Sequence, residues 1–155
     1  MSECKIILLN QGFEAKVDPE DYEQLSKHRW GVRHGHHVHY AVRWVNRKAI
    51  LMHRQIMKAK KGQIIDHIND DGLDNRRSNL RFCTRSQNSA NSRLIRKTYS
   101  NLKGVSWDKT NEYWVVRIQK DKKRMFLGCF KDKIEAHKVY VEVAKDFHGE
   151  FARTL

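Results

Sequence analysis

The polar segment at residues 61–92 constrains the fold of this chain more than any other stretch. A short apolar pair leads into Asp66-His67, and after a long polar run Leu80–Cys83 has the composition of a second short strand. Thr84 is a good N-cap for a helix over the residues that follow. The predicted order is therefore strand, long polar loop, strand and helix. A polar loop of this length usually serves a function.

Four polar side chains in this segment suit the hydrolysis of a phosphodiester bond. The reaction needs a base that activates water and a cation on the scissile phosphate. His67 has an unperturbed pKa that suits a base at neutral pH. Asp66 offers a hard oxygen ligand and Asn88 a neutral carbonyl, and two such oxygens with waters and phosphate oxygens are how Mg²⁺ is normally held. Asn79 is placed to tie the loop by bonding its backbone groups.

The first sixty residues predict short strands with helical pieces. Apolar runs on either side of Gly12 indicate a hairpin, and Asp18 is the expected N-cap of a short helix. The alternating stretch 31–45 favours strands with a turn at Gly35. From His53 onward a helix fits better than a strand.

The last third of the chain predicts a second domain. A basic stretch at residues 93–99 is the expected linker between domains at 1–92 and 100–155. Three strand-like segments follow it, and then an amphipathic helix that Gly149 ends. The simplest arrangement is a three-stranded antiparallel sheet packed on one helix. Between residues 93 and 124, ten Lys and Arg stand against three acids, so the basic excess gathers on the sheet side.

The charge balance points to a polyanion as the partner. The chain holds 31 Lys and Arg against 18 Asp and Glu, a net charge of +13, which favours nucleic acid first and an acidic membrane second. No run of 18 apolar residues exists to form a transmembrane helix. The first residues do not have the pattern of a secretory signal. Three scattered cysteines without a CxxC pair argue against disulfides and a cysteine-based zinc site. We therefore expect a cytoplasmic protein.

The polar segment closely resembles the HNH endonuclease family, in particular the small phage-type homing enzymes of the ββα-metal (His-Me finger) fold. The resemblance rests on DHINDDGLDNRRSNLRFCTRSQNSANS, LMHRQIM and DYEQLSKHRWGV, and it covers roughly residues 15–92. It implies that His67 is the general base and Asn79 the structural middle residue. It also implies that Asp66 and Asn88 hold one Mg²⁺ or Mn²⁺ ion per active site. Asn88 stands where the family name has a histidine, which is an accepted variant of the pattern.

Residues 100–155 resemble a second family, the Apetala-two-type DNA-binding domain of plant regulators and some phage homing endonucleases. The resemblance rests on KGVSWDKTNEYWVVRIQ, LGCF and EAHKVYVEVAKDFHGEFA. It implies a sheet that presents Arg and Trp side chains to the major groove of DNA. The matching positions are Lys103, Trp107, Trp114, Arg117 and Arg124. Ser106 and Gln119 stand where plant members commonly carry arginine, so base preference does not carry over.

These features together predict an α+β protein of two modules that acts on double-stranded DNA. We expect a metal-dependent endonuclease of the homing type that cuts one strand or both. Arg81 is the best candidate among the arginines around the loop for a phosphate contact. No membrane and no stable protein partner are expected, although two chains could act together on one duplex. A phage-encoded chain would act in the cytoplasm of its host cell.

Four other interpretations stay open on the sequence alone. A DNA-binding protein could retain the nuclease half only as a scaffold, and an RNA-binding structural protein would fit the charge but not the His-Asn set. Trp107 and Trp114 could be core residues beside a solvated basic face. The four histidines within residues 34–39 could bind zinc, but no cysteine or acid at metal spacing supports them.

Overall fold

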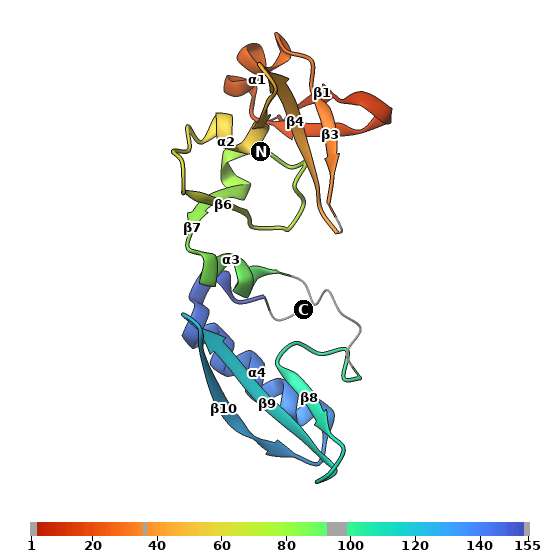
Figure 1. Ribbon diagram of the computed structural model, residues 1–155, viewed down its shortest axis with the longest axis vertical. Helices are drawn as coiled ribbons and strands as arrows, with labels where there is room; N and C mark the ends of the chain where they lie inside the picture. The colour runs from red at the N-terminus through yellow and green to blue at the C-terminus, as the bar shows by residue number, and fades with distance from the viewer. Residues whose placement is uncertain (1–2, 36, 93–98, 154–155) are drawn as a thin grey trace. The chain divides into compact units, whose positions relative to one another are not determined.

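The chain folds into small antiparallel sheets and short helices, an α+β architecture as predicted (Figure 1). The computed structural model describes residues 3–35, 37–92 and 99–153. Contacts between residues divide the chain into a first unit, Met1–Thr84, and a second unit, Arg85–Leu155. Most of the predicted linker at 93–99 lies outside the described residues, so the predicted domain bounds stay a prediction.

Among its described residues, the first unit holds three antiparallel sheets, two α-helices and two short 3-10 helices, which are labelled η. In chain order its elements are β1 (Lys5–Leu8), η1 (Asn10–Gly12), β2 (Glu14–Val17), α1 (Pro19–Ser26), β3 (Gly31–His34), β4 (His39–Val45), β5 (Lys48–Leu51), α2 (Met52–Ile56), β6 (Ile64–His67), η2 (Arg77–Asn79) and β7 (Leu80–Cys83). The sheets are β1-β2, β3-β4-β5 and β6-β7. Short turns join the strands of the first two sheets, because neighbouring runs in the sequence commonly pair. A long loop joins β6 to β7.

The start of α1 differs in one detail from the expected cap. Pro19 occupies the first turn, as its fixed φ favours. Asp18 precedes it in an extended conformation, but its side chain makes no capping bond. Its carboxylate instead accepts a hydrogen bond from the backbone N–H of Arg77, at 2.7 Å. The residue that should cap a local helix therefore ties that helix to a loop 59 residues away in the sequence.

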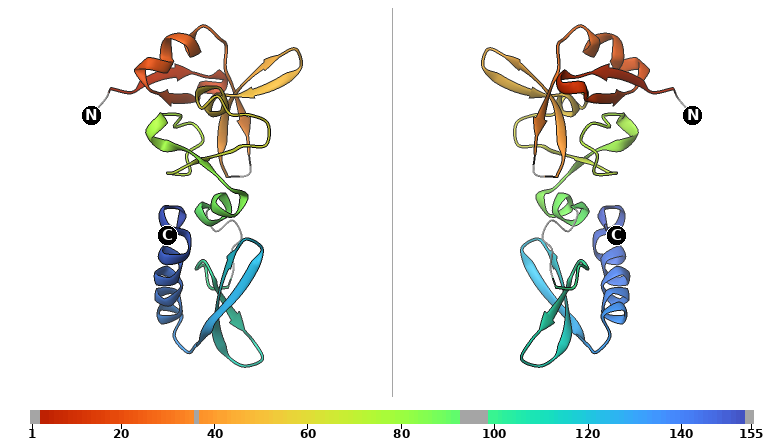
Figure 2. Two further views of the ribbon diagram at one scale, coloured as in Figure 1. Left: turned by 90° about the vertical axis from the view of Figure 1, so that its left-hand side faces the viewer. Right: turned by 90° about the vertical axis from the view of Figure 1, so that its right-hand side faces the viewer.

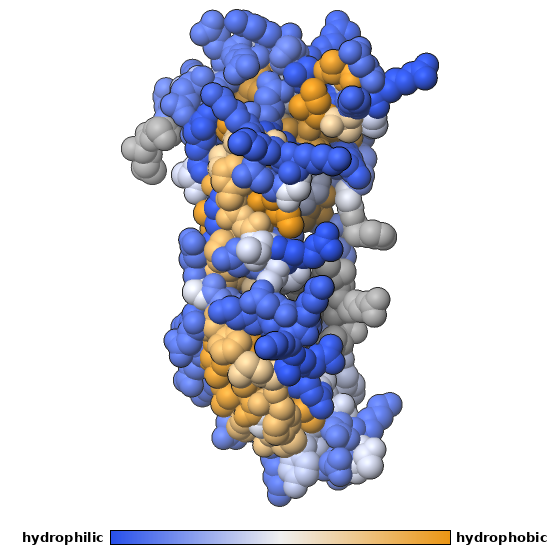
Figure 3. Space-filling view, turned by 60° about the vertical axis from the view of Figure 1, so that its left-hand side comes forward, coloured by the Kyte–Doolittle hydropathy of each residue, from blue (hydrophilic) through white to orange (hydrophobic). Residues whose placement is uncertain are grey.

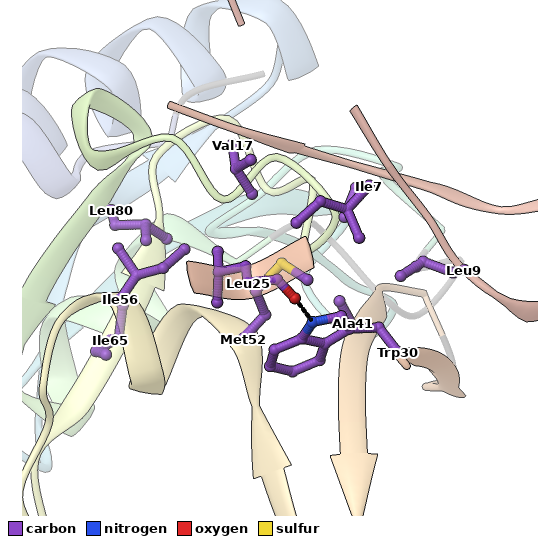
Figure 4. Packing of buried hydrophobic residues seen from close by; sticks show 11 residues of the cluster. Ile7, Leu9, Val17, Leu25, Trp30, Ala41, Met52, Ile56, Ile65 and Leu80 are labelled. Carbon is purple, nitrogen blue, oxygen red and sulfur yellow. Dashed lines mark hydrogen bonds between the residues drawn. The ribbon is translucent and has the colours of Figure 1, made fainter. Parts of the chain in front are cut away.

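Eleven apolar residues form the core of the first unit, and they come from most of its elements (Figure 4). Leu25 and Met52 are fully buried near its middle. Trp30 is buried with them, and its indole N–H donates to the backbone carbonyl of Leu25 at 2.9 Å. This bond satisfies the one polar group that a buried tryptophan carries. Ile65 and Leu80 bring β6 and β7 into the same core.

The second unit is a three-stranded antiparallel sheet with one long helix packed on it (Figures 1 and 2). Its elements are α3 (Arg85–Asn91), β8 (Val105–Asp108), β9 (Tyr113–Lys120), β10 (Lys123–Phe130), α4 (Lys133–His148) and η3 (Gly149–Phe151). The strand order is β10-β9-β8. Asp132 caps α4, since its side chain accepts from the N–H of Glu135 at 2.7 Å.

A close approach between backbone and ring fixes the sheet of this unit against α4. Gly104 has φ +75, and a Cβ built there would lie 2.0 Å from the ring of Tyr140. Tyr140 is buried in the core with Val105, Val116 and Ala136. Only glycine fits at position 104, because it accepts the positive φ and leaves the ring its place.

The face shown in Figure 3 is mixed. Hydrophilic side chains cover much of it, and hydrophobic side chains gather between them; the mean hydropathy of the sequence is −0.79. Within the described part of the chain, we find no helix with the length and apolar character that spanning a bilayer requires.

Candidate active site

The predicted metal ligand Asp66 and the predicted general base His67 are neighbours at the end of β6, which pairs with β7. Asp66 lies opposite Arg81 and His67 lies opposite Leu80 in the antiparallel register. Both Asp66 and His67 are buried, each 6% exposed. The long loop that follows His67 and returns to β7 is visible beside the labels of the two strands in Figure 1.

The ring of His67 lies in a cluster with two other rings. Its centroid is 4.9 Å from that of His53 on α2, in an edge-to-face arrangement, and 5.8 Å from that of Tyr40 on β4. Its Nε2 atom is 3.4 Å from Oδ1 of Asn75, which is fully buried. Three separate elements therefore hold the orientation of His67. His53 itself is buried.

Burial lowers the pKa of both histidines in this cluster. For His67, desolvation is the main cause, and the Asn75 hydrogen bond and the Asp66 carboxylate oppose it. For His53, desolvation comes first and the positive charges of protonated His67 and Arg54 add to it, which lowers the pKa to about 3. Both rings are therefore neutral at pH 7.

His53 should make the protein less stable in acid. In the unfolded chain it takes up a proton near pH 6.5, whereas the folded protein holds its pKa at about 3. Protonation therefore favours the unfolded state as the pH falls below about 6.5. Between pH 8 and pH 5 this residue should remove about 2 kcal/mol from the free energy of unfolding. Urea titrations of wild type and His53→Gln at both pH values measure the difference. An equal loss in the two proteins would contradict the buried, neutral state of His53.

Asn79 is the centre of a hydrogen-bond network that shapes the loop. Its Oδ1 accepts from the backbone N–H of Asn69 at 3.0 Å. Its Nδ2 donates to Oδ1 of Asn69 at 2.9 Å and to the carbonyl of Asp74 at 2.8 Å. Its own carbonyl accepts from Ile68 N at 2.9 Å. These contacts are of the kind expected of Asn79 from the sequence, and they connect both ends of the loop.

The loop is also bound to β2, which no local pattern indicated. The N–H of Lys16 donates to the carbonyl of Leu73 at 2.9 Å, and the N–H of Asn75 donates to the carbonyl of Lys16 at 2.8 Å. Gly72 packs so closely on β4 that a Cβ there would lie 2.3 Å from the carbonyl oxygen of His39. The loop is thus held like an extra strand, and it carries Asn75 to His67.

Two arginines fix the outer part of the loop through carboxylates. Arg76 makes a bidentate pair with the buried Asp74, at 2.8 and 2.6 Å. Arg77 contacts Asp21 at 2.7 Å and Glu20 at 2.8 Å, both on α1. Such paired contacts position a backbone segment as well as neutralise it. The acidic group on and just before α1 is therefore a docking point for the loop.

The carboxylate of Asp66 suits a hard divalent cation, but it already has a cationic partner. Arg81 contacts Oδ2 of Asp66 through Nε at 2.9 Å and through Nη2 at 2.8 Å, and its side chain is 11% exposed. A carboxylate offers two hard oxygen donors with about four lone-pair sites. The donor chemistry therefore fits a Mg²⁺ or Mn²⁺ ion. The phosphate contact predicted for Arg81 would compete with the Asp66 pair.

Asn88 belongs to a different unit of the chain from the other three motif residues. It is exposed on α3, which belongs to the second unit, whereas Asp66, His67 and Asn79 belong to the first. Its role as the second ligand of a metal ion stays a prediction.

The register of the second sheet separates the predicted tryptophans from the predicted arginines. Trp107 lies opposite Trp114, and Trp114 packs against the core on the α4 side. Because alternate residues of a strand face opposite sides, Arg117 lies on the other face. Arg124 shares that face, since it lies opposite Gln119. Both arginines are exposed, so the DNA contacts predicted for these four side chains do not all belong to one face.

Lys103 contacts the end of α3. Its Nζ donates to the carbonyl of Ala90 and, at 2.9 Å, to that of Ser92. Cations commonly bind the last carbonyls of a helix in this way. The DNA contact predicted for Lys103 stays a prediction, and it would compete with these two carbonyls.

The described histidines at the β3–β4 turn include His34 and His39, which contact each other's rings, and His34 also contacts Gln11. His34 and His39 lie edge to face at 4.9 Å, and a ring nitrogen of His34 is 3.0 Å from the side-chain oxygen of Gln11. His36 lies outside the described residues. Zinc binding by this cluster therefore stays an open alternative from the sequence.

Comparisons with known proteins agree with the chemistry of the β6–β7 segment. A family model described as HNH endonuclease matches residues 51–90, from the end of β5 to the last turn of α3. The chain is also similar to "Protein 3.8" of Escherichia phage T7, with 32% identity over 111 residues that cover 68% of this chain and 91% of that protein. No solved structure matches the chain. An Apetala-two-type domain is not among these matches.

Proposed function

Because the chain belongs to the family of phage T7 Protein 3.8 and contains an HNH endonuclease domain, we propose that it is a metal-dependent endonuclease on duplex DNA with His67 as its general base. One observation carries the proposal. Inside the matched segment, a buried Asp66-His67 pair ends a strand beside a loop that Asn79 holds together.

The surroundings of His67 favour one tautomer of its ring. Nδ2 of Asn75 donates to the carbonyl of Leu73 at 3.1 Å, which turns Oδ1 of Asn75 toward His67. An oxygen at that place accepts a hydrogen bond from protonated Nε2. The lone pair of a neutral His67 then lies on Nδ1, and this atom takes the proton of the attacking water. Burial lowers the pKa of His67, which keeps the ring unprotonated at neutral pH and able to accept a proton.

A divalent ion would be held by Asp66 and by the side-chain carbonyl of Asn88. When bound, the ion supplies positive charge for the scissile phosphate and for the leaving 3′ oxygen. The Asp66–Arg81 pair holds the carboxylate in a fixed orientation. Arg117 and Arg124, exposed on one face of the second sheet, supply cations for DNA outside this site.

Incubation with supercoiled plasmid tests the proposal. We expect Mg²⁺ to support conversion to the open-circular form and EDTA to abolish it. One active site per chain favours nicking, so linear product should appear only when two chains act together. A retarded but uncut plasmid would leave the alternative of a DNA-binding protein without catalysis. Absence of both binding and cleavage would exclude both functions.

A further inference from the structure

The first unit contains an open cleft of about 580 Å³ that is separate from the β6–β7 site. All of its lining residues lie between residues 8 and 44, on or beside β1, β3 and β4. Trp30 and Val42, both buried, are among its lining residues. Its volume falls in the range of sites that hold one small ligand or one nucleotide.

Two large apolar side chains stand exposed at this cleft. Trp44 is 69% exposed and Leu8 is 75% exposed. Trp44 lies near the end of β4, and Figure 2 shows the β4–β5 hairpin, in orange to yellow, extending from the rest of the first unit. A tryptophan this exposed leaves a ring face for a flat partner.

The charged groups at the cleft are all cationic. Arg43 is held in place, because its guanidinium lies 5.5 Å from the centre of the Trp30 ring and its Nε donates to Gln55 at 3.1 Å. The remaining N–H groups of a guanidinium can bind an anion. Arg29 is exposed beside it, and the described lining residues include no carboxylate.

We propose that this cleft binds an unpaired segment of DNA, with one base stacked on Trp44 and the adjoining phosphates on Arg29 and Arg43. The proposal rests on the proposed function, since it gives the nuclease a contact with single-stranded DNA outside its active site. It assigns a role to three residues that the HNH motif does not include.

The combination of groups favours an unpaired strand over a duplex or a protein segment. Bases within a duplex cover one another's faces, so a tryptophan can stack only on a base that has left the helix. Aromatic side chains within a positively charged groove are the usual way in which proteins bind single strands. An apolar peptide would fit Trp44 and Leu8, but it would leave Arg29 and Arg43 without an anion.

Fluorescence anisotropy in EDTA, where cleavage does not interfere, tests the proposal with the full chain. The probes are a labelled single-stranded DNA oligonucleotide and a duplex of the same sequence. Trp44→Ala should weaken single-strand affinity by about 5–150-fold, the range for the loss of one stacked base. Duplex affinity should change by less than about twofold. Trp44→Phe should retain most of the single-strand affinity, because it keeps a ring.

Two matched controls test whether the effects depend on the charge of Arg29 and on the ring of Trp44 in particular. Arg29→Glu should weaken the single strand in the same selective way, while Lys27→Glu, an exposed cation two residues away, should not. Tyr22→Ala removes an exposed aromatic ring on α1 and should have no effect. Unchanged single-strand affinity in both Trp44→Ala and Arg29→Glu overturns the proposal, and so does an equal loss for duplex. If the wild type binds the single strand through Trp44 but does not nick plasmid, the proposed role of the cleft stands and the proposed nuclease function is wrong.

Discussion

His67→Ala should reduce plasmid cleavage by roughly 10²–10⁴-fold, the usual range for loss of a general base. The affinity for DNA should change little, because His67 is only 6% exposed and offers a duplex very little contact surface. The initial rate of nicking under saturating Mg²⁺ measures the first effect, and a gel shift in EDTA measures the second.

The matched control is His37→Ala, which removes an exposed histidine at the β3–β4 turn. It should cleave at the wild-type rate. His67→Ala creates a cavity beside His53 and Tyr40, so its thermal unfolding must be measured at the same time. A folded His67→Ala protein that nicks as fast as wild type would show that another group is the base.

Asp66→Ala should destabilise the protein by about 3–5 kcal/mol, which is the usual cost of removing one partner of a buried ion pair. The reason is Arg81, whose side chain is only 11% exposed and would lose the carboxylate that neutralises it. The double variant Asp66→Ala, Arg81→Leu should recover much of this loss, since both charges are then absent. Urea unfolding of the two single variants and the double variant gives the coupling energy.

Asp66→Asn separates stability from metal binding. An amide oxygen still accepts a bond from Arg81 but is a weaker ligand than a carboxylate. The concentration of Mg²⁺ for half-maximal cleavage should rise by roughly 10–100-fold, as when a partner around a metal ligand is lost. If the Mg²⁺ dependence of cleavage is unchanged in a folded Asp66→Asn protein, Asp66 is not a ligand of the ion.

Local patterns in the sequence predicted most of the elements. The apolar runs around Gly12 became the β1–β2 hairpin, and the change from strand to helix near His53 falls at Met52. These predictions succeed because neighbouring strands pair through short turns and because capping chemistry is local. The three-stranded sheet of the second unit and its helix followed from the same kind of signal.

The parts of the site that depend on distant residues could not be predicted from the sequence. Nothing near Lys16 indicates that its backbone binds the loop at Leu73 and Asn75. Nothing near Tyr40 indicates a ring beside His67. Alternation along β9 does place Trp114 and Arg117 on opposite faces, and this was visible in the sequence once the strand was recognised. The family resemblance predicted DNA contacts for both residues, because both match positions of the same family pattern.

The docking of the loop on β2 and α1 has a consequence for how the surroundings of His67 form during folding. Asp18 and Asp21 meet Arg77 across 59 and 56 residues of chain, so these contacts have a high contact order and form after the local hairpins. The segment that matches the HNH model begins only at residue 51 and lacks β2 and α1. It therefore cannot be grafted onto another scaffold by itself, because the geometry around His67 is completed by a part of the chain synthesised long before it.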